Sequence, residues 1–326
     1  MPGQAAGESP GFIASMLVTA VAGLTTDAAE FVAEAKCDGL RACIAVAGGR
    51  VRAWSGNGRD ITAAYPELSV LAAVAGRRTL VLDGEIVALS GPRPDFTALQ
   101  RRMRTGRPGA GLLAAVPVTL IVFDVLRSGR GQLAGRPYVL RRALLEDLRL
   151  QVPGTVQVPP AFPGDAAAVL RVTREQGYEG IVLKRPASLY HPGRRTREWL
   201  KIRNIHAIDV RAGGRLPGTG ARAHLAGSVL MGIPRLGGLE FAGTVGSGLP
   251  MAELRELTAL LESVEQPVSP FTGPLPPAIT RHARWARPVI TAQVSLPRAH
   301  PVRTGCANRY GAASDPARSR RVELSR

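Results

Sequence analysis

The sequence predicts an α+β domain with antiparallel sheets, followed by a second domain built as a small β-barrel. Three observations support this: the length of 326 residues, an irregular mixture of strand and helix patterns up to about residue 203, and short glycine-rich strand patterns after it. A chain of this length usually forms two domains. Strands and helices without regular βαβ alternation favour antiparallel pairing.

The first domain is expected over residues 1–203. Residues 31–47 predict two strands joined by a loop around Cys37 to Leu40. The helix pattern from 165 to 177 begins at a capping aspartate, Asp165, and ends at Gly177. Further strands are predicted at 78–89, 117–126, 178–185 and 197–203, and further helices at 95–104 and 138–150.

The second domain is expected over residues 204–295, with a boundary in the region 203–208. Its short strand patterns are separated by glycines and followed by a helix pattern at 250–264. Short strands with frequent turns are typical of small barrels such as the OB type. Residues 296–326 are arginine-rich without hydrophobic periodicity, which predicts a basic, disordered tail.

The charge of the chain points to an anionic partner. The net charge is +17 and the pI is about 11.2. Nucleic acid is the first candidate for such a basic chain. No apolar run reaches the roughly 18 residues that a membrane span needs. The three cysteines suggest no disulfide framework, and a reduced, cytoplasmic location is expected.

The three lysines, Lys36, Lys184 and Lys201, stand out because the other 39 of the 42 basic residues are arginine. Arginine stays protonated and cannot be a nucleophile. A lysine amine can, once its pKa is lowered from about 10.4 by a nearby cation or by burial. Lys36 lies within K-C-D-G-L-R and is the candidate nucleophile. For Lys184, a position on a surface strand without any function is an equally good explanation.

The acidic residues suggest a metal site near a phosphate. Asp83 and Glu85 are two apart in a predicted strand and share a face. Glu179 opens another strand. Carboxylates from separate strands favour Mg²⁺ or Mn²⁺ held by few protein ligands and several waters.

Five short motifs, in this order, resemble the covalent nucleotidyltransferase superfamily. More narrowly, they resemble the small bacterial ATP-dependent DNA ligases, including the ligase module of bacterial end-joining proteins. The resemblance covers roughly residues 10–295 and implies an adenylation (nucleotidyltransferase) domain followed by an OB-type domain. The motifs are K-C-D-G-L-R (36–41), D-G-E (83–85), F-D (123–124), E-G-I-V-L-K (179–184) and W-L-K-I-R (199–203).

The resemblance implies a three-step reaction and a role for each motif residue. Lys36 would first take AMP from ATP. The AMP would then pass to a DNA 5′-phosphate, and finally the 3′-hydroxyl of the nick would displace the AMP. The other implied roles are adenine recognition by Glu34, stacking on adenine by Phe123, ribose binding by Arg41, ribose or metal binding by Glu85, metal binding by Glu179, phosphate binding by Lys201 and Arg203, and orientation of the nucleophile loop by Asp38. Without the motif context, Phe123 would be read as ordinary core packing.

Three positions depart from the family pattern. Gly56 stands where the family has an arginine near the phosphates, which predicts slower adenylation or nick recognition. Arg203 replaces the usual lysine, which keeps the charge. The sequence after Val294 does not resemble the closing basic motif of the family.

Two alternatives to the ligase function remain open. One is an RNA ligase or capping-type nucleotidyltransferase on the same scaffold. The other is a nucleic-acid-binding protein with impaired catalysis, favoured by Gly56 and by the tail. For a ligase, the expected partners are nicked duplex DNA and end-joining proteins supplied by other chains. A monomer associated with the bacterial nucleoid is expected.

Overall fold

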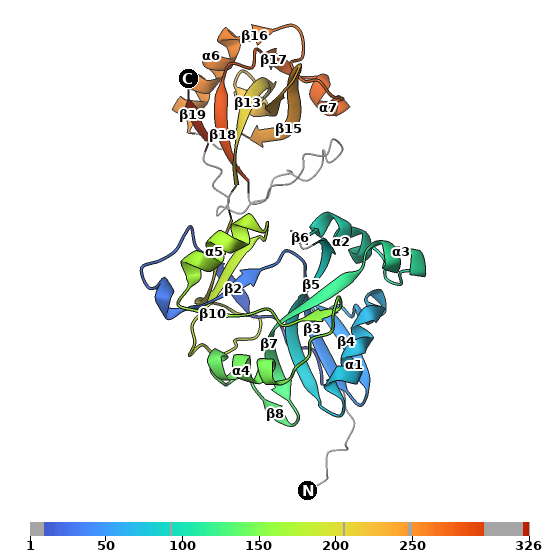
Figure 1. Ribbon diagram of the computed structural model, residues 1–326. Helices are drawn as coiled ribbons and strands as arrows, with labels where there is room; N and C mark the ends of the chain where they lie inside the picture. The colour runs from blue at the N-terminus through green and yellow to red at the C-terminus, as the bar shows by residue number, and fades with distance from the viewer. Residues whose placement is uncertain (1–9, 92, 205, 247–249, 297–321, 326) are drawn as a thin grey trace. The chain divides into compact units, whose positions relative to one another are not determined.

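The computed structural model (Figure 1) describes residues 10–91, 93–204, 206–246, 250–296 and 322–325. The chain divides into two compact units, Met1–Asn204 and Ile205–Arg326. This division lies one residue beyond the end of the first domain predicted from the sequence.

The smaller sheet of the first unit carries Lys36 at the end of a strand. Its strand order is β1, β12, β11, β2, β10, with β1 parallel to β12 and the other neighbours antiparallel. Helix α5 (Ala166–Glu175) packs on β2 and β11, where Phe31, Ile181 and Leu183 are buried. The strand bounds are Leu17–Ala20 (β1), Val32–Lys36 (β2), Phe162–Pro163 (β10), Gly180–Lys184 (β11) and Arg195–Arg203 (β12).

The larger sheet of the first unit forms the base of the largest buried apolar cluster. Its strand order is β4, β3, β5, β7, β8, with β6 paired to β5 and β9 parallel to β7. The strand bounds are Leu40–Ala47 (β3), Arg50–Ser55 (β4), Leu80–Ser90 (β5), Arg93–Pro94 (β6), Val118–Ser128 (β7), Gly131–Gln132 (β8) and Val156–Gln157 (β9). The helices are α1 (Val70–Ala75), α2 (Phe96–Met103), α3 (Ala110–Ala115) and α4 (Tyr138–Asp147), with 3-10 turns η1 (Ala28–Glu30), η2 (Thr62–Ala64) and η3 (Pro66–Ser69).

A buried cluster joins the two sheets. Cys43 and Trp54 come from the larger sheet, Trp199 comes from the smaller one, and Met16 and Tyr190 complete the contact. The aromatic rings of Tyr190 and Trp199 meet edge to face with centroids 5.7 Å apart. Such packing holds the facing strands of the two sheets in a fixed relation.

Helices α2 and α5 begin where the sequence predicted them, but only one of the two has a side-chain cap. Asp95 caps α2, because its Oδ1 accepts a hydrogen bond from the Ala98 amide at 2.9 Å. Asp165 precedes α5 as predicted, but its side chain makes no capping hydrogen bond.

The second unit is built on one long central strand, β13 (His206–Pro217). It pairs with β14, β17 and β18 in antiparallel fashion, and α6 (Met251–Ser263) contributes Leu254, Leu257 and Leu261 to the core. The remaining elements are β14 (Ala226–Arg235), β15 (Gly238–Gly246), β16 (Glu265–Gln266), β17 (Arg284–Ala286), β18 (Thr291–Leu296), β19 (Val322–Ser325), α7 (Pro277–Thr280) and η4 (Gly220–Arg222).

The end of the chain differs from the sequence prediction of a disordered tail over 296–326. Leu296 still belongs to β18, and Val322–Ser325 form β19, which pairs antiparallel with β18. A four-residue V-E-L-S segment is too short to be recognised as a strand without its partner. Residues 297–321 and 326 lie outside the described part of the chain. Among the described residues, no helix is long and apolar enough to cross a bilayer.

Candidate active site

Lys36 meets Glu179 because of the register between β2 and β11. These strands are antiparallel with Gly180 opposite Lys36, so the residue before β11 lies beside the lysine. Lys36 Nζ is 2.7 Å from Glu179 Oε2, and the Glu179 amide donates to the Lys36 carbonyl at 3.1 Å. About 20% of the Lys36 side chain remains exposed. The amine is therefore both oriented by a carboxylate and accessible to a substrate.

The end of β12 brings further cations to the same carboxylate. Arg203 lies opposite Gly180, and its Nε donates to Glu179 Oε1 at 3.1 Å. Burial, together with repulsion from Arg203 and Lys36, lowers the pKa of Lys201. Three cationic side chains thus gather at the junction of β2, β11 and β12, which is suited to an anionic phosphate chain.

Two glycines of the motifs are required by close backbone approach. A Cβ on Gly180 would lie 2.0 Å from the Ile202 carbonyl oxygen, and its φ of +152° is one that L side chains rarely adopt. A Cβ on Gly39 would lie 2.3 Å from the Ile86 carbonyl oxygen on β5. Gly39 therefore lets the loop after Lys36 pack directly against the larger sheet.

The larger sheet places an arginine–carboxylate cluster on its facing strands. Arg41 donates to both oxygens of Asp83, at 2.6 Å each, and Tyr190 Oη donates to Asp83 Oδ2 at 2.6 Å. Arg41 Cζ lies 4.5 Å from the centroid of the Phe123 ring. This bidentate geometry fixes the guanidinium in one orientation over the ring.

Glu85 lies opposite Arg41 in the register of β3 and β5. Burial raises the pKa of Glu85 to about 7. Attraction by Arg41 and Lys36 opposes this rise, whereas repulsion by Asp83 and Glu179 adds to it. The Glu85 carboxylate on β5 therefore experiences the charge of Glu179, which lies just before β11. No cluster of three or more potential metal ligands occurs among the described residues.

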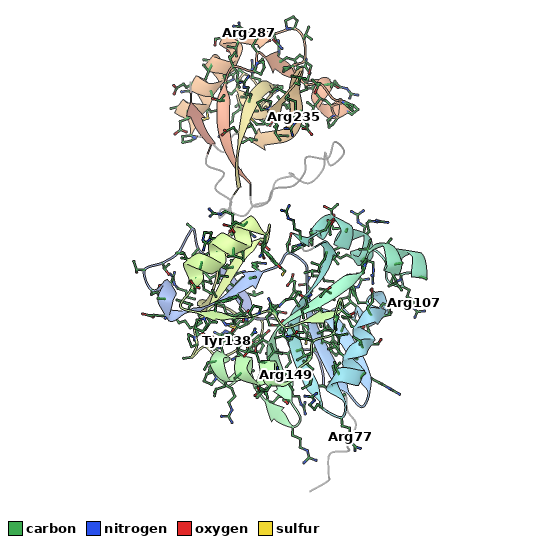
Figure 2. All side chains as sticks on the ribbon, viewed as in Figure 1. Arg77, Arg107, Tyr138, Arg149, Arg235 and Arg287 are labelled. Atoms are coloured by element: carbon green, nitrogen blue, oxygen red, sulfur yellow. The ribbon has the colours of Figure 1, made fainter. Side chains whose placement is uncertain are left out.

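Glu34 lies in a buried polar network. Its Oε2 is 2.7 Å from Lys184 Nζ, its Oε1 accepts a short hydrogen bond from Tyr138 Oη, and Arg142 Nη1 lies 3.6 Å away. Figure 2 shows Tyr138 at the start of α4, and its side chain is buried. The two residues of the network that the sequence could not reveal, Tyr138 and Arg142, follow Glu34 by more than 100 positions.

Lys184 is 1% exposed, which contradicts the surface-strand alternative considered from the sequence. Its Nζ lies 4.8 Å from the ring centroids of Phe123 and Tyr138 and 4.4 Å from that of Trp199. Burial lowers the pKa of Lys184, against the attraction of Glu34. The aromatic rings and the carboxylate together compensate part of the cost of burying the ammonium.

The positions of the remaining predicted residues are as follows. Asp38 lies in the loop between β2 and β3, and Phe123 lies on β7, where its ring contacts the cations of Arg41 and Lys184. The Gly56 amide donates to the Arg41 carbonyl at 2.9 Å. A Cβ on Gly56 would meet Arg41 Cβ at 3.5 Å, an ordinary contact, so a larger side chain has room there.

The two sheets and their lysine–carboxylate centre define a nucleotidyltransferase fold with an OB-type domain after it. A family model described as "ATP dependent DNA ligase domain" matches residues 13–203, and "ATP dependent DNA ligase C terminal region" matches residues 222–301. The chain belongs to the ATP-dependent DNA ligase family. The second match extends the resemblance to residue 301, past the limit at Val294 that the sequence suggested.

Individual relatives agree with the family. The chain is 39% identical over 285 residues to "Multifunctional non-homologous end joining DNA repair protein LigD" of Mycobacterium tuberculosis, covering 86% of this chain and 36% of that protein. It is 37% identical over 241 residues to "Probable DNA ligase" of Streptomyces griseus, covering 69% of this chain and 47% of that protein. The chain therefore spans about a third to a half of the length of these relatives.

The solved ligase domain of M. tuberculosis LigD superposes with a TM-score of 0.54 at 36% identity, covering 89% of this chain and 90% of that one. A mycobacterial DNA ligase D complexed with ATP and MES gives a TM-score of 0.53, also at 36% identity, with the same coverage. The fold class predicted from the sequence is confirmed.

Proposed function

We propose that this chain seals nicks between a 3′-hydroxyl and a 5′-phosphate in DNA, using ATP and a lysyl-AMP intermediate on Lys36. The observation that supports this most is the accessible Lys36 amine held 2.7 Å from Glu179, beside Lys201 and Arg203. Family membership supplies the reaction class, and the cationic surroundings fit a phosphate chain.

The proposed first step transfers AMP to the protein. The neutral Lys36 amine attacks the α-phosphorus of ATP, an N–P bond forms, and the P–O bond to pyrophosphate breaks. Glu179 Oε2 is placed to accept the proton that leaves Nζ, since the two atoms are 2.7 Å apart. Lys201 and Arg203 would stabilise the negative charge that develops on the phosphate oxygens.

The later steps occur at DNA. An oxygen of the 5′-phosphate attacks the phosphorus of lysyl-AMP, so that the N–P bond breaks and a DNA-adenylate forms. The 3′-hydroxyl then attacks the 5′-phosphate, and AMP leaves. The charge of +17 fits binding to the phosphates of duplex DNA with little sequence preference.

A divalent cation, Mg²⁺ or Mn²⁺, fits the residues present. Glu85 and Glu179 would hold it, since Mg²⁺ is commonly bound by one or two carboxylates with substrate phosphates and water completing its shell. The raised pKa of Glu85 fits a carboxylate that a cation would stabilise in its ionised form. The cation would neutralise phosphate charge during the transfer.

The nucleoside contacts are proposed on the family pattern. Phe123 would stack on adenine, Arg41 would bind the ribose side, Glu85 could serve the ribose instead of the metal, and Asp38 would orient the loop. Glu34 would contact the adenine amino group, but its carboxylate is already bound by Tyr138 and Lys184. Glu34→Gln should therefore change the preference for ATP over GTP only if nucleotide binding breaks the contacts of Glu34 with Tyr138 and Lys184.

The biological setting is also proposed from the relatives. A role in end joining, together with end-joining proteins supplied by other chains, is proposed because the M. tuberculosis relative is described as a non-homologous end joining DNA repair protein. The protein is expected to act as a monomer on DNA in the nucleoid of a bacterium.

The test combines labelling with sealing. ATP labelled at its α-phosphate and Mg²⁺ are incubated with wild type and with Lys36→Ala, and then a nicked duplex is added. Label on wild type alone, followed by sealing, supports the proposal. DNA binding without label or sealing would favour the impaired binding protein that Gly56 suggests. Labelling from GTP, or sealing of RNA in preference to DNA, would favour the RNA ligase or capping alternative.

A further inference from the structure

The segment 188–191, between β11 and β12, holds two buried side chains although it forms neither strand nor helix. Ser188 is 0% exposed and Tyr190 is 3% exposed. The Ser188 carbonyl accepts hydrogen bonds from the Tyr138 amide at 2.8 Å and from Arg141 Nη1 at 3.2 Å. These bonds tie the segment to α4. None of the roles proposed above uses it.

The Tyr190 hydroxyl has one fixed orientation. The Met16 amide donates a hydrogen bond to Tyr190 Oη at 2.9 Å, so Oη is the acceptor in this contact. A hydroxyl has a single proton to donate, and this one is directed at Asp83 Oδ2, which lies 2.6 Å from Oη. The ring packs edge to face against Trp199. Tyr190 therefore donates to Asp83 from a rigid position.

Asp83 links Tyr190 to Arg41. The Asp83 side chain is 1% exposed, and its Oδ2 accepts from both Tyr190 Oη and Arg41 Nη2, each at 2.6 Å. Arg41 Nε donates to the other carboxylate oxygen at 2.6 Å. An arginine–carboxylate pair can still turn as a unit about the side-chain bonds of the aspartate, whereas a further hydrogen bond from a rigid donor restricts that rotation. Tyr190 thus limits the orientations open to the Arg41 guanidinium.

The Arg41 guanidinium keeps one side available for a ligand. Its side chain is 25% exposed, and its Nη1 makes no hydrogen bond within the described part of the chain. Its Cζ lies 4.5 Å from the centroid of the Phe123 ring, the ring proposed above to stack on adenine. Arg41 therefore lies beside the proposed base site with a donor that Asp83 does not use.

We propose that Tyr190 is a positioning residue for ATP binding, which acts through Asp83 to hold Arg41 in the orientation that meets the ribose side of the nucleotide. Tyr190 itself does not touch the nucleotide in this role. The inference rests on the proposed ligase function, in which Arg41 binds that side of ATP. Small displacements of a binding group weaken its contacts strongly, so residues that fix its rotamer affect function without contacting the substrate.

The experiment compares Tyr190→Phe with a matched control, Tyr65→Phe. Tyr65 is also buried, at 2% exposed, but its hydroxyl has no hydrogen-bond partner among the described residues. The initial rate of labelling by ATP labelled at its α-phosphate is measured without DNA over a range of ATP concentrations. The affinity for ATP is measured separately in the Lys36→Ala background, where the nucleophile is absent. Thermal unfolding verifies that every variant is folded at the assay temperature.

The expected result separates positioning from a general loosening of the fold. Tyr190→Phe should raise both the KM for ATP and the Kd by about fivefold to twentyfold. The maximum rate of labelling and the fraction of protein that can be labelled should stay within about twofold of wild type, because a contact made equally before and during the reaction affects KM alone. Tyr65→Phe should match wild type in all of these quantities.

An Asp83→Ala background tests whether Tyr190 acts through Asp83. Asp83→Ala alone should raise the KM for ATP at least as much as Tyr190→Phe, since it removes both hydrogen bonds that hold Arg41. Adding Tyr190→Phe to Asp83→Ala should change the KM by less than about twofold further, because the hydroxyl then has no carboxylate to hold.

Three results would overturn the role of Tyr190. The first is a folded Tyr190→Phe protein with the KM and Kd of wild type. The second is a lower maximum rate or a smaller labelled fraction at unchanged KM, which would show only a structural role. The third is a full additional increase in KM when Tyr190→Phe is added to Asp83→Ala. A wild type that takes no label from ATP would instead reject the proposed function itself.

Discussion

Two lysine–glutamate pairs on the same two strands have opposite surroundings. Strand β2 contributes Glu34 and Lys36, and β11 contributes Lys184 with Glu179 just before it. In each pair a lysine Nζ lies 2.7 Å from a glutamate Oε2. Distance alone therefore does not distinguish them.

Burial distinguishes the two pairs. The side chains of Lys184 and Glu34 are 1% and 4% exposed, whereas those of Lys36 and Glu179 are 20% and 12% exposed. Three aromatic rings surround the Lys184 amine, whereas further cations adjoin Lys36. The comparison supports the proposal that the pair at the strand end takes part in chemistry, and it indicates that the pair inside the sheet also contributes to stability.

Replacing the accessible lysine should have the largest effect on activity. Lys36→Arg keeps the charge beside Glu179 but removes an amine that can lose its proton. We expect lysyl-AMP formation to fall by at least about a thousandfold, because a covalent mechanism has no substitute for its nucleophile. Labelling with ATP measures this, and Lys184→Arg is the matched comparison. Substantial labelling of the Lys36→Arg protein would contradict the assignment.

Removing the buried lysine should have the largest effect on stability. Lys184→Met leaves the Glu34 carboxylate buried beside Tyr138 without its main counter-charge, and we expect a loss of about 3–5 kcal/mol in the free energy of unfolding. Lys36→Met, in the more exposed pair, should cost about 0–1 kcal/mol. Urea unfolding measures both.

A double variant sharpens this stability comparison. Glu34→Gln combined with Lys184→Met removes both charges and should recover part of the loss, because no unpaired buried charge remains. Equal losses for Lys184→Met and Lys36→Met would refute the contrast between the two pairs.

Glu85 makes the stability of the protein depend on pH, because its carboxyl group has a shifted pKa and interacts with the charges of Lys36 and Glu179. Its pKa in the folded protein, about 7, is above its ordinary value of 4.5, so the folded state binds the proton more tightly. Its contribution to stability is therefore present below about pH 4.5 and is lost as the pH rises through 7.

The Glu85→Gln variant isolates this contribution. Its unfolding free energy, measured without divalent cations, should improve relative to wild type from pH 5 to pH 8, by at most about 3 kcal/mol. A difference between the two proteins that stays constant with pH would show that Glu85 does not titrate in this range.

Tyr138 should contribute less to stability than its neighbour Lys184. Tyr138→Phe removes one hydrogen bond to the Glu34 carboxylate while Lys184 remains, and hydrogen bonds to charged groups contribute about 1.5–3 kcal/mol. We expect a loss of about 2 kcal/mol in urea unfolding. Unchanged stability would mean that Lys184 alone satisfies Glu34.

The sequence predicted the strand that carries Lys36, the proposed nucleophile, and it drew attention to the Glu179 carboxylate beside it. Five motifs in order identified Lys36 and Glu179, and the two-residue spacing put Asp83 and Glu85 on one face. Periodicity also predicted α2, α4, α5 and α6. These features depend on local patterns or on the motif order, which is why they could be predicted from the sequence.

The partners of the site residues were not accessible from the sequence. Tyr138 binds Glu34 across 104 positions, and Tyr190 binds Asp83 across 107. Neither tyrosine lies in one of the five motifs, and the packing of α4 and of the segment before β12 places them at the site. Burial of Lys184 was equally hidden, because a lysine at a strand end gives no local sign of its surroundings.

The most direct test of the central contrast is the site of adenylation. Wild-type protein is incubated with ATP and Mg²⁺, digested, and its peptides are mapped by mass spectrometry. AMP on the peptide that contains Lys36, and none on those with Lys184 or Lys201, is the predicted result. AMP on Lys184 or Lys201, or on no lysine while nicked DNA is still sealed, would contradict it.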